Sequence, residues 1–326
     1  MDTATEPLLE ISNLRIELDE RSQLVEDVSF RLQRGETLAI VGESGCGKSL
    51  TSLAIVGLLP EALVDGVSGT ILFEQTDLLA ASEKTLRNVR GKQIAMVFQD
   101  ALSALNPLMT VEQQIEEGLM AHGAIAKDKA RERVLELLKM VRIPDPVARL
   151  SSYPHELSGG MRQRILIAMA MACEPKLILA DEPTTALDTT VQAQILDVIK
   201  SIQKRANLGL ILVTHDLGVA RYMARRMVVM YAGSVVEAGL VDDILNAPKH
   251  PYTAGLMQAR PHGSFRRDGH LLRDIQGLVP APRNRPRGCQ FSPRCDRATE
   301  RCRAEMPPLV GPKTEHQIRC FHPITE

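Results

Sequence analysis

The segment Gly42 to Ser49, GESGCGKS, constrains the fold more than any other part of the chain. It matches the pattern G-x-x-x-x-G-K-[ST], with the apolar run LAIV before it and the helix-forming run KSLTSLAIVGLL after it. Glycines in such a loop let backbone N–H groups turn towards phosphate oxygens, and the following helix adds the positive end of its dipole. The sequence predicts a nucleotide site in which Lys48 reaches the β and γ phosphates and the Ser49 hydroxyl binds Mg²⁺. The expected nucleotide-binding residues are Gly42, Glu43, Ser44, Gly45, Cys46, Gly47, Lys48, Ser49 and Leu50.

Short apolar runs alternate with amphipathic stretches through most of the chain. Each run has four or five residues bounded by polar residues or glycine, which is typical of buried strands in a parallel sheet. The predicted strands are Leu38–Val41, Ile94–Phe98, Leu177–Ala180, Leu210–Val213 and Met227–Met230, and the predicted helices are Lys48–Leu59, Lys127–Met140, Met161–Met171 and Val191–Arg205. This order predicts an α/β fold of the doubly wound kind, with a helical insertion at about residues 100–160.

Two adjacent carboxylates follow one of these strands, in the segment LILADEPTTALD. Neighbouring residues on a strand face opposite ways, so Asp181 and Glu182 are expected to have different roles. We expect Asp181 to hold Mg²⁺, directly or through water, and Glu182 to face the attacking water as general base. An acidic turn after a strand is common by itself, but together with the phosphate loop it favours nucleotide hydrolysis.

The composition limits the classes of partner and the compartment. Thirty-nine Lys and Arg nearly balance 40 Asp and Glu, which argues against a protein built on nucleic-acid binding. From residue 261 onward 12 basic residues outnumber seven acidic ones, which indicates either an anionic partner or a solvated charged face. The N-terminus resembles no secretory signal, and no window is apolar enough to span a bilayer. We therefore expect a cytosolic chain, in which clustered cysteines indicate metal or redox chemistry.

The segment LSGGMRQR, residues 157–164, narrows the class. It resembles the signature of the ATP-binding cassette (ABC) ATPases: Ser-Gly-Gly at a helix start offers N–H groups, a hydroxyl and a dipole that suit a γ-phosphate. The resemblance implies an ABC core with a mostly parallel sheet, an antiparallel β portion at the N-terminus and ATP sandwiched between two chains. Because each motif occurs once, a second ATPase must supply the other half-site. The signature residues that would face the partner's ATP are Ser158, Gly159, Gly160 and Met161.

Three further residues fall in the order that this resemblance implies. Gln99, in MVFQD, resembles the residue that contacts Mg²⁺ and water and signals to the membrane subunit. Asp188, in TALD, resembles the residue that crosses the dimer interface. His215, in ILVTHD, resembles the histidine that contacts the γ-phosphate and orders the Glu182 region. Mg²⁺ would then be held by Ser49, Gln99 and Asp181.

One element of the pattern departs from the family. Its members usually stack adenine on an aromatic residue near the start of the cassette, where this chain has Leu18. We expect a base affinity weaker by roughly 1 kcal/mol than a stacked site provides. Cys46 lies inside the phosphate loop, where we interpret it as a tolerated small residue. An accessible thiol there would block ATP binding when alkylated.

The tail contains four of the six cysteines, Cys289, Cys295, Cys302 and Cys320. Structural zinc sites usually contain a closely spaced C-x(2–4)-C pair, which this tail lacks. Four thiolates on irregular loops can also hold an iron–sulfur cluster. Three interpretations stay open: a [4Fe–4S] cluster, zinc with His316 or His322 as substitute ligands, and free thiols. A structural role is favoured over electron transfer, because a small region with few apolar residues needs a staple.

Several segments narrow the resemblance to the ATPases of dipeptide, oligopeptide and nickel permeases, among them QDALSALNP, SYPHELSGGMRQR, HPYTAGL and GCQFSPRC. It implies an ABC domain at 1–260 and a Cys-containing C-terminal domain at 261–326. It also implies two membrane subunits, a second ATPase that is often a different chain, an extracytoplasmic substrate-binding protein, and a place at the cytoplasmic face of the membrane. Two alternatives remain at this point: a soluble ABC ATPase outside transport, and a metal- or redox-sensing regulator.

Overall fold

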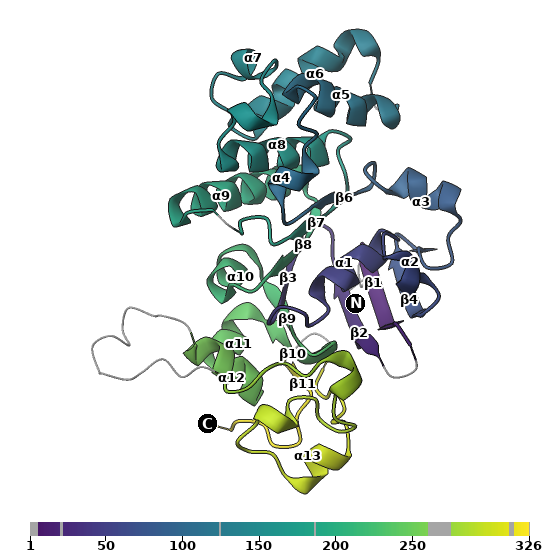
Figure 1. The fold of residues 1–326 in the computed structure, drawn as a ribbon, viewed down its shortest axis with the longest axis vertical. Coiled ribbons are helices and arrows are strands. Elements are labelled where there is room, and N and C mark those ends of the chain that lie inside the picture. The colour runs from purple at the N-terminus through teal and green to yellow at the C-terminus, as the bar shows by residue number, and fades with distance from the viewer. Residues whose placement is uncertain are drawn as a thin grey trace, which may run out of the picture. The chain divides into compact units, whose positions relative to one another are not determined.

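A computed structural model of the chain describes residues 6–19, 22–123, 125–185, 187–259, 275–312 and 316–325 (Figure 1). The chain forms two compact units. Unit 1 takes the described residues of Met1–Leu8, Leu32–Thr37 and Glu74–Val213, and unit 2 takes those of Leu9–Arg31, Leu38–Phe73 and Thr214–Glu326. The predicted domain boundary near residue 260 falls within 260–274, outside the described residues.

Unit 1 is built on parallel strands. β6 (Ile94–Val97), β7 (Leu177–Asp181) and β8 (Gly209–Thr214) are adjacent in the order β8-β7-β6, and β7 and β8 are buried along their whole length. Such burial on both faces explains why these strands are continuous apolar runs rather than alternating ones. The predicted strands at these positions are confirmed, with β7 one residue longer and β8 two residues longer than predicted, whereas β6 ends one residue earlier, at Val97.

The helical insertion of unit 1 contains more helices than the one long helix that the sequence suggested. α6 (Lys127–Met140) has the predicted bounds. α5 (Val111–Ala121) begins at a capping box in which Thr110 Oγ1 accepts from Gln113 N and Gln113 Oε1 accepts from Thr110 N, a signal that we did not use. The other elements of unit 1 are β5 (Thr76–Asp77), α3 (Glu83–Val89), α4 (Ala101–Ala104), α7 (Pro146–Arg149), α8 (Gly159–Met171) and α9 (Thr189–Ala206).

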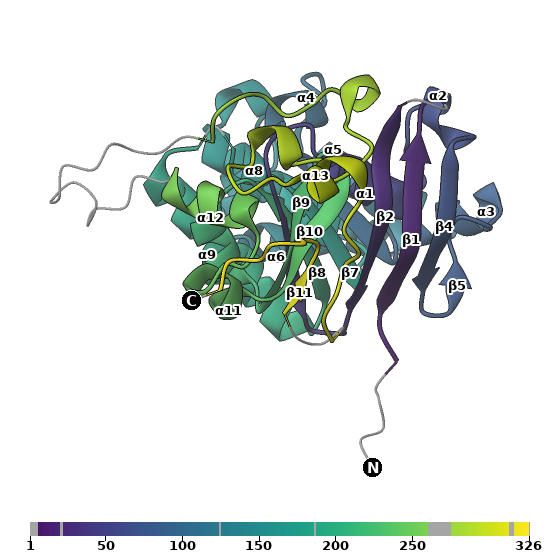
Figure 2. The same cartoon turned by 90° about the horizontal axis from the view of Figure 1, so that it is seen from below.

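Unit 2 contains the expected antiparallel portion. β1 (Leu9–Glu17) lies between β2 (Gln23–Leu32) and β4 (Val67–Phe73), and β1 and β4 run antiparallel (Figure 2). Buried and less buried residues alternate along most of β1, as expected where one face of a sheet is packed. A register shift between Ser12 and Arg15 interrupts this pairing.

The rest of unit 2 connects the phosphate-loop strand to the tail. β3 (Thr37–Val41) pairs in parallel with β9 (Arg226–Tyr231); β10 (Ser234–Leu240) then pairs antiparallel with both β9 and β11 (Gln317–Ile318). The tail therefore contributes the outer strand of this group. The helices of unit 2 are α1 (Lys48–Ile55), α2 (Glu61–Val64), α10 (Leu217–Met223), α11 (Val241–Asn246), α12 (Pro251–Gln258) and α13 (Glu300–Ala304).

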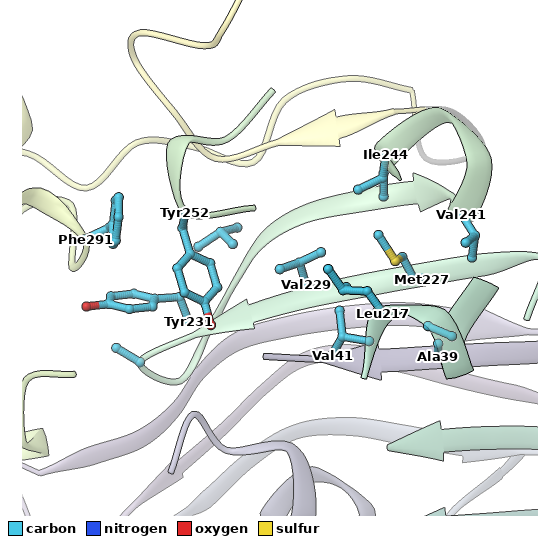
Figure 3. Close-up of a cluster of buried hydrophobic side chains, with 13 residues drawn as sticks. Ala39, Val41, Leu217, Met227, Val229, Tyr231, Val241, Ile244, Tyr252 and Phe291 are labelled. Carbon is cyan, nitrogen blue, oxygen red and sulfur yellow. The ribbon is translucent and has the colours of Figure 1, made fainter. Parts of the chain in front are cut away.

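A buried apolar cluster connects these elements of unit 2. It extends from Ala39 and Val41 on β3 to the rings of Tyr231, Tyr252 and Phe291, which lie together at one end of the cluster (Figure 3). Tyr231 ends β9, Tyr252 belongs to α12 and Phe291 belongs to the tail, so the tail shares a core with β3 and β9. Within the described part of the chain, every helix is too short or too polar to cross a membrane.

Candidate nucleotide-binding and hydrolysis sites

The predicted phosphate loop lies in unit 2 between β3 and α1, as expected. Two glycines are required by its geometry: Gly42 has φ 154° and a Cβ there would come within 2.2 Å of the Met230 carbonyl oxygen, and Gly47 caps α1 with φ 98°. Lys48 Nζ donates to the carbonyl oxygens of Gly42 and Glu43, both at 2.9 Å, and the side chain is buried. The lysine thus connects the start of the loop to the start of the helix.

The loop presents a polar exposed part and a buried part. Ser44, Gly45 and Ser49 are exposed, whereas Cys46 is completely buried. Burial raises the pKa of the Cys46 thiol, against the lowering effect of Lys48. Alkylation was expected to block ATP binding only where the Cys46 thiol is accessible. In this structure the thiol is buried and not accessible.

The predicted carboxylates lie in unit 1. β7 ends at the buried Asp181, and Glu182, directly after the strand, adopts a left-handed backbone with φ 46°, so the direction of the Glu182 side chain is not set by strand alternation as we had expected. Gln99 Nε2 donates to Glu182 Oε2 at 3.3 Å and Thr185 Oγ1 donates to the same oxygen at 2.9 Å. The structure thus brings Gln99 and Glu182 together, and it adds Thr185, which the sequence reasoning missed although TT follows DEP directly.

The predicted switch histidine follows the neighbouring strand. Val213 of β8 is in register with Asp181 of β7, and His215 lies two residues further along and is exposed. The next residue, Asp216, caps α10 by accepting from the N–H groups of Gly218 and Val219. This cap fixes the backbone directly after the histidine.

The signature segment begins α8 in unit 1. Ser158 is the N-cap and accepts from Met161 N at 3.3 Å, while Ser158 and Gly159 are exposed. A Cβ on Gly160 would come within 2.6 Å of Val191 Cγ1 on α9, so this glycine is needed for the close packing of the two helices. The exposed start of a 13-residue helix offers the N–H groups and dipole that favour an anion, as the sequence predicted.

Two other predicted residues have local roles. Asp188 is the N-cap of α9 and accepts from Thr190 N and Val191 N at 3.0 and 2.9 Å. Leu18, where an aromatic residue was expected from the family, is about half exposed directly after β1, and its N–H donates to Ser22 O.

The four tail cysteines line one small cavity in unit 2, together with His250, Phe291 and His322. Burial raises the pKa of Cys289 to about 11, with smaller contributions from the other three thiols, and it also raises the pKa of Cys295 and Cys320. Of the two candidate histidines, His322 lines the cavity and bonds Thr299 Oγ1 at 2.9 Å, whereas His316 is bonded to Glu237 instead.

The lining and size of this cavity can be compared with what zinc or an iron–sulfur cluster needs. Among the described residues, no three His, Cys, Asp or Glu side chains are placed to hold a single metal ion. The cavity that the thiols line with these other residues has a volume of about 10 Å³, room for about one water molecule. Four soft donors in one cavity suit zinc or iron chemically.

Comparisons with known proteins agree with these motifs. A family model described as ABC transporter matches residues 25–185, and one described as oligopeptide/dipeptide transporter, C-terminal region, matches residues 236–302. The chain is 46% identical to a dipeptide transport ATP-binding protein of Bacillus subtilis and 45% identical to one of Escherichia coli. The alignments cover 97% and 98% of this chain and 95% and 98% of those proteins.

Solved structures show the same fold. A dimeric, post-hydrolysis form of the ATP-binding cassette MJ0796 with ADP and Pi is 28% identical with a TM-score of 0.62, over 72% of this chain and 98% of that one. A Clostridium perfringens protein, cbiO1, part of an ABC transporter complex, is 28% identical with a TM-score of 0.64, over 74% of this chain and 91% of that one. These relatives give no support to a non-transport ATPase or a redox regulator. The chain belongs to the ABC transporter family and is one of its ATP-hydrolysing subunits, of the kind that carries the oligopeptide/dipeptide transporter C-terminal region.

Proposed function

We propose that this ATPase powers the import of dipeptides or oligopeptides through a membrane permease. The observation that carries the proposal is the tail: the match to the oligopeptide/dipeptide transporter C-terminal region accompanies 45–46% identity over nearly the full length of dipeptide transport proteins. The tail, which we propose to begin near residue 261, is what distinguishes the chain from a cassette with ABC motifs alone.

ATP with Mg²⁺ is the substrate expected of an ABC ATPase, and we assign its contacts to the predicted residues. The phosphate loop, Gly42 to Leu50, would bind the phosphates, with Mg²⁺ held by Ser49, Gln99 and Asp181. Glu182 would act as general base, oriented by its hydrogen bonds to Gln99 and Thr185. His215 would contact the γ-phosphate.

We propose that a second ATPase completes each site. Its ATP would face Ser158, Gly159, Gly160 and Met161 of this chain, and Asp188 would lie at the interface. The N-terminus of α8 supports this arrangement, because Ser158 and Gly159 are exposed at a helix end that favours phosphate.

We propose that the membrane subunits dock on unit 1 beside the helical portion at about 100–160. A groove of about 270 Å³ lies there between β6 and the helices, lined by Phe98, Ile115 and Met169 among others. Its wall includes Phe98, which is 43% exposed and directly precedes Gln99. A helix of the permease seated in this groove would contact Phe98. Phe98 is next to Gln99, which donates a hydrogen bond to Glu182. Such docking places the chain at the cytoplasmic face of the membrane, with the substrate-binding protein on the other side.

We propose that the four cysteines hold a [4Fe–4S] cluster, with zinc as the second candidate. Support comes from the convergence of the four thiols of Cys289, Cys295, Cys302 and Cys320 on one cavity. The cluster would staple a tail that has little regular structure in its described part. Iron, acid-labile sulfide and zinc measured per chain on protein purified without oxygen decide between them. About four irons lost in Cys295→Ser but kept in Cys173→Ser support the cluster; one zinc and no iron contradicts it.

The assigned chemistry is tested by Glu182→Gln in the complex with its membrane subunits. The variant should bind ATP normally and lose turnover by roughly a hundredfold or more, because only the base is removed. Glu174→Gln is the matched control: Glu174 also has a left-handed backbone, φ 53°, but it precedes β7 and pairs with Arg133. Normal turnover in Glu182→Gln, or equal loss in both, contradicts the assignment. Failure to co-purify with any integral membrane subunit would contradict the transport function.

A further inference from the structure

One residue of the phosphate loop, Glu43, is held by the tail. Arg294 Nη1 donates to Glu43 Oε2 at 2.7 Å and Arg294 Nη2 donates to Oε1 at 3.2 Å, a bidentate pair between residues 251 positions apart. The Arg294 side chain is 5% exposed and that of Glu43 is 28% exposed. A bidentate guanidinium–carboxylate pair fixes orientation as well as charge, and burial reduces its screening by solvent.

Arg294 is itself rigidly placed. Its Nε donates to Gln276 O and its Nη2 to Ile275 O, both at 3.0 Å. The guanidinium also lies over the ring of Tyr231, 5.7 Å from the centroid. Burial disfavours the charged form, but the hydrogen bonds to Glu43 and Tyr231 outweigh it, so the pKa of Arg294 is raised above its ordinary value. The arginine is thus a charged, fixed anchor rather than a mobile surface side chain.

The same loop residue has two more contacts. The N–H of Glu43 donates to Tyr252 Oη at 2.8 Å, and its carbonyl oxygen accepts from Lys48 Nζ at 2.9 Å. The Tyr252 ring packs against Tyr231 and Phe291, with centroids 4.7 and 5.5 Å away. A displacement of Glu43 would therefore be transmitted directly to Lys48, the lysine of the phosphate-binding motif.

We propose that Arg294 is a positioning residue for the ATPase: acting through Glu43, it holds the phosphate loop in the conformation that receives ATP. This inference rests on the proposed nucleotide site. Arg294 also neutralises a carboxylate that lies within a loop meant for phosphates, where an unpaired negative charge would repel the ligand. Because the next residue, Cys295, lines the cysteine cavity, the loop and the cavity share one short segment of the tail.

The test compares ATP dissociation constants of the full chain with a fluorescent ATP analogue, and KM and kcat of the assembled complex. Arg294→Gln should raise both the dissociation constant and KM about tenfold, since it leaves a half-buried carboxylate unpaired beside the phosphates, while kcat at saturating ATP stays within about twofold. The double variant Glu43→Gln/Arg294→Gln should recover only part of the affinity, because the repulsive charge is gone but the bidentate anchor of the loop is still missing. The ATP affinity of Arg294→Lys should lie between those of the wild type and Arg294→Gln, since lysine keeps the charge but loses the bidentate geometry.

Arg319→Gln is the matched control. Arg319 is also a tail residue of unit 2 with a buried side chain, 8% exposed, and it pairs with Asp27 of β2 rather than with the phosphate loop. Equal loss of affinity in Arg319→Gln and Arg294→Gln would reduce the pair to a structural contact, and wild-type affinity in the double variant would show that the charge of Glu43 and not the position of the loop matters; either result overturns the inference. A wild-type chain that binds no ATP would instead overturn the proposed nucleotide site.

Discussion

Tyr252→Phe removes one atom that holds the phosphate loop and little else. Tyr252 is completely buried, and its hydroxyl accepts the Glu43 N–H at 2.8 Å. Phenylalanine keeps the ring contacts with Tyr231 and Phe291. The change therefore separates the hydrogen bond from the packing that surrounds it.

The expected cost follows from the group that loses its partner. A buried donor without an acceptor costs about 1–3 kcal/mol, and since Glu43 is only half-buried we expect about 1 kcal/mol of unfolding free energy. Tyr252→Ala also removes the ring and should cost about 3–5 kcal/mol. Tyr231→Phe should cost less than Tyr252→Phe, because the hydroxyl of Tyr231 makes only a 3.5 Å contact with Arg294 Nη1.

The assay is urea unfolding of the purified chain, followed by titration with an ATP analogue under native conditions. The reasoning predicts a lower urea midpoint with an unchanged slope for Tyr252→Phe, and weaker ATP binding than in Tyr231→Phe. A cost for Tyr252→Phe as large as that for Tyr252→Ala would refute it, because the ring and not the hydroxyl would then carry the effect. A Tyr252→Phe variant with the stability and the ATP affinity of the wild type would also refute the reasoning.

Two other changes test separate parts of the structure. Leu18→Tyr should strengthen ATP binding by about 1 kcal/mol by providing a ring for adenine, whereas Leu58→Tyr, at a similarly exposed leucine, should not; an unchanged dissociation constant contradicts the role of position 18. Burial lowers the pKa of His250 from 6.5 to about 4, against the opposing charge of Glu237. The unfolded chain then binds the proton more readily, so the stability due to His250 is present above pH 6.5 and lost as the pH falls towards 4, about 2 kcal/mol by pH 5. The difference between the unfolding midpoints at pH 7 and pH 5 should be smaller in His250→Asn than in the wild type. Asparagine keeps an acceptor for the Tyr252 N–H, and an equal difference in the two proteins contradicts the role of His250.

The sequence predicts the framework of this fold well because the framework depends on local patterns. Buried strands of four to six residues are continuous apolar runs, so β3, β6, β7, β8 and β9 were recognisable. The phosphate loop was recognisable because Gly42 and Gly47 are required by backbone geometry, which leaves a fixed spacing in the sequence. Helix caps such as Ser158 carry a similarly local signal.

Contacts between distant segments leave no such pattern. Nothing in the spacing of Glu43 and Arg294 indicates that they form an ion pair, and the tyrosines that support the pair look like ordinary core residues. The orientation of Glu182 also escaped prediction, because a non-glycine residue with φ 46° is sterically uncommon and depends on its surroundings. The sequence groups the four tail cysteines only by their clustering near the end of the chain, and it is the fold that shows them lining one cavity.

The central claim is that this chain hydrolyses ATP to drive peptide import, and the direct measurement is coupled transport. The chain would be reconstituted in lipid vesicles with its membrane subunits, partner ATPase and binding protein, and dipeptide uptake would be measured beside ATP hydrolysis. We predict that ATP drives uptake, that dipeptide stimulates hydrolysis, and that Glu182→Gln abolishes both. Hydrolysis that is indifferent to peptide, with no peptide accumulating in the vesicles, would contradict the claim.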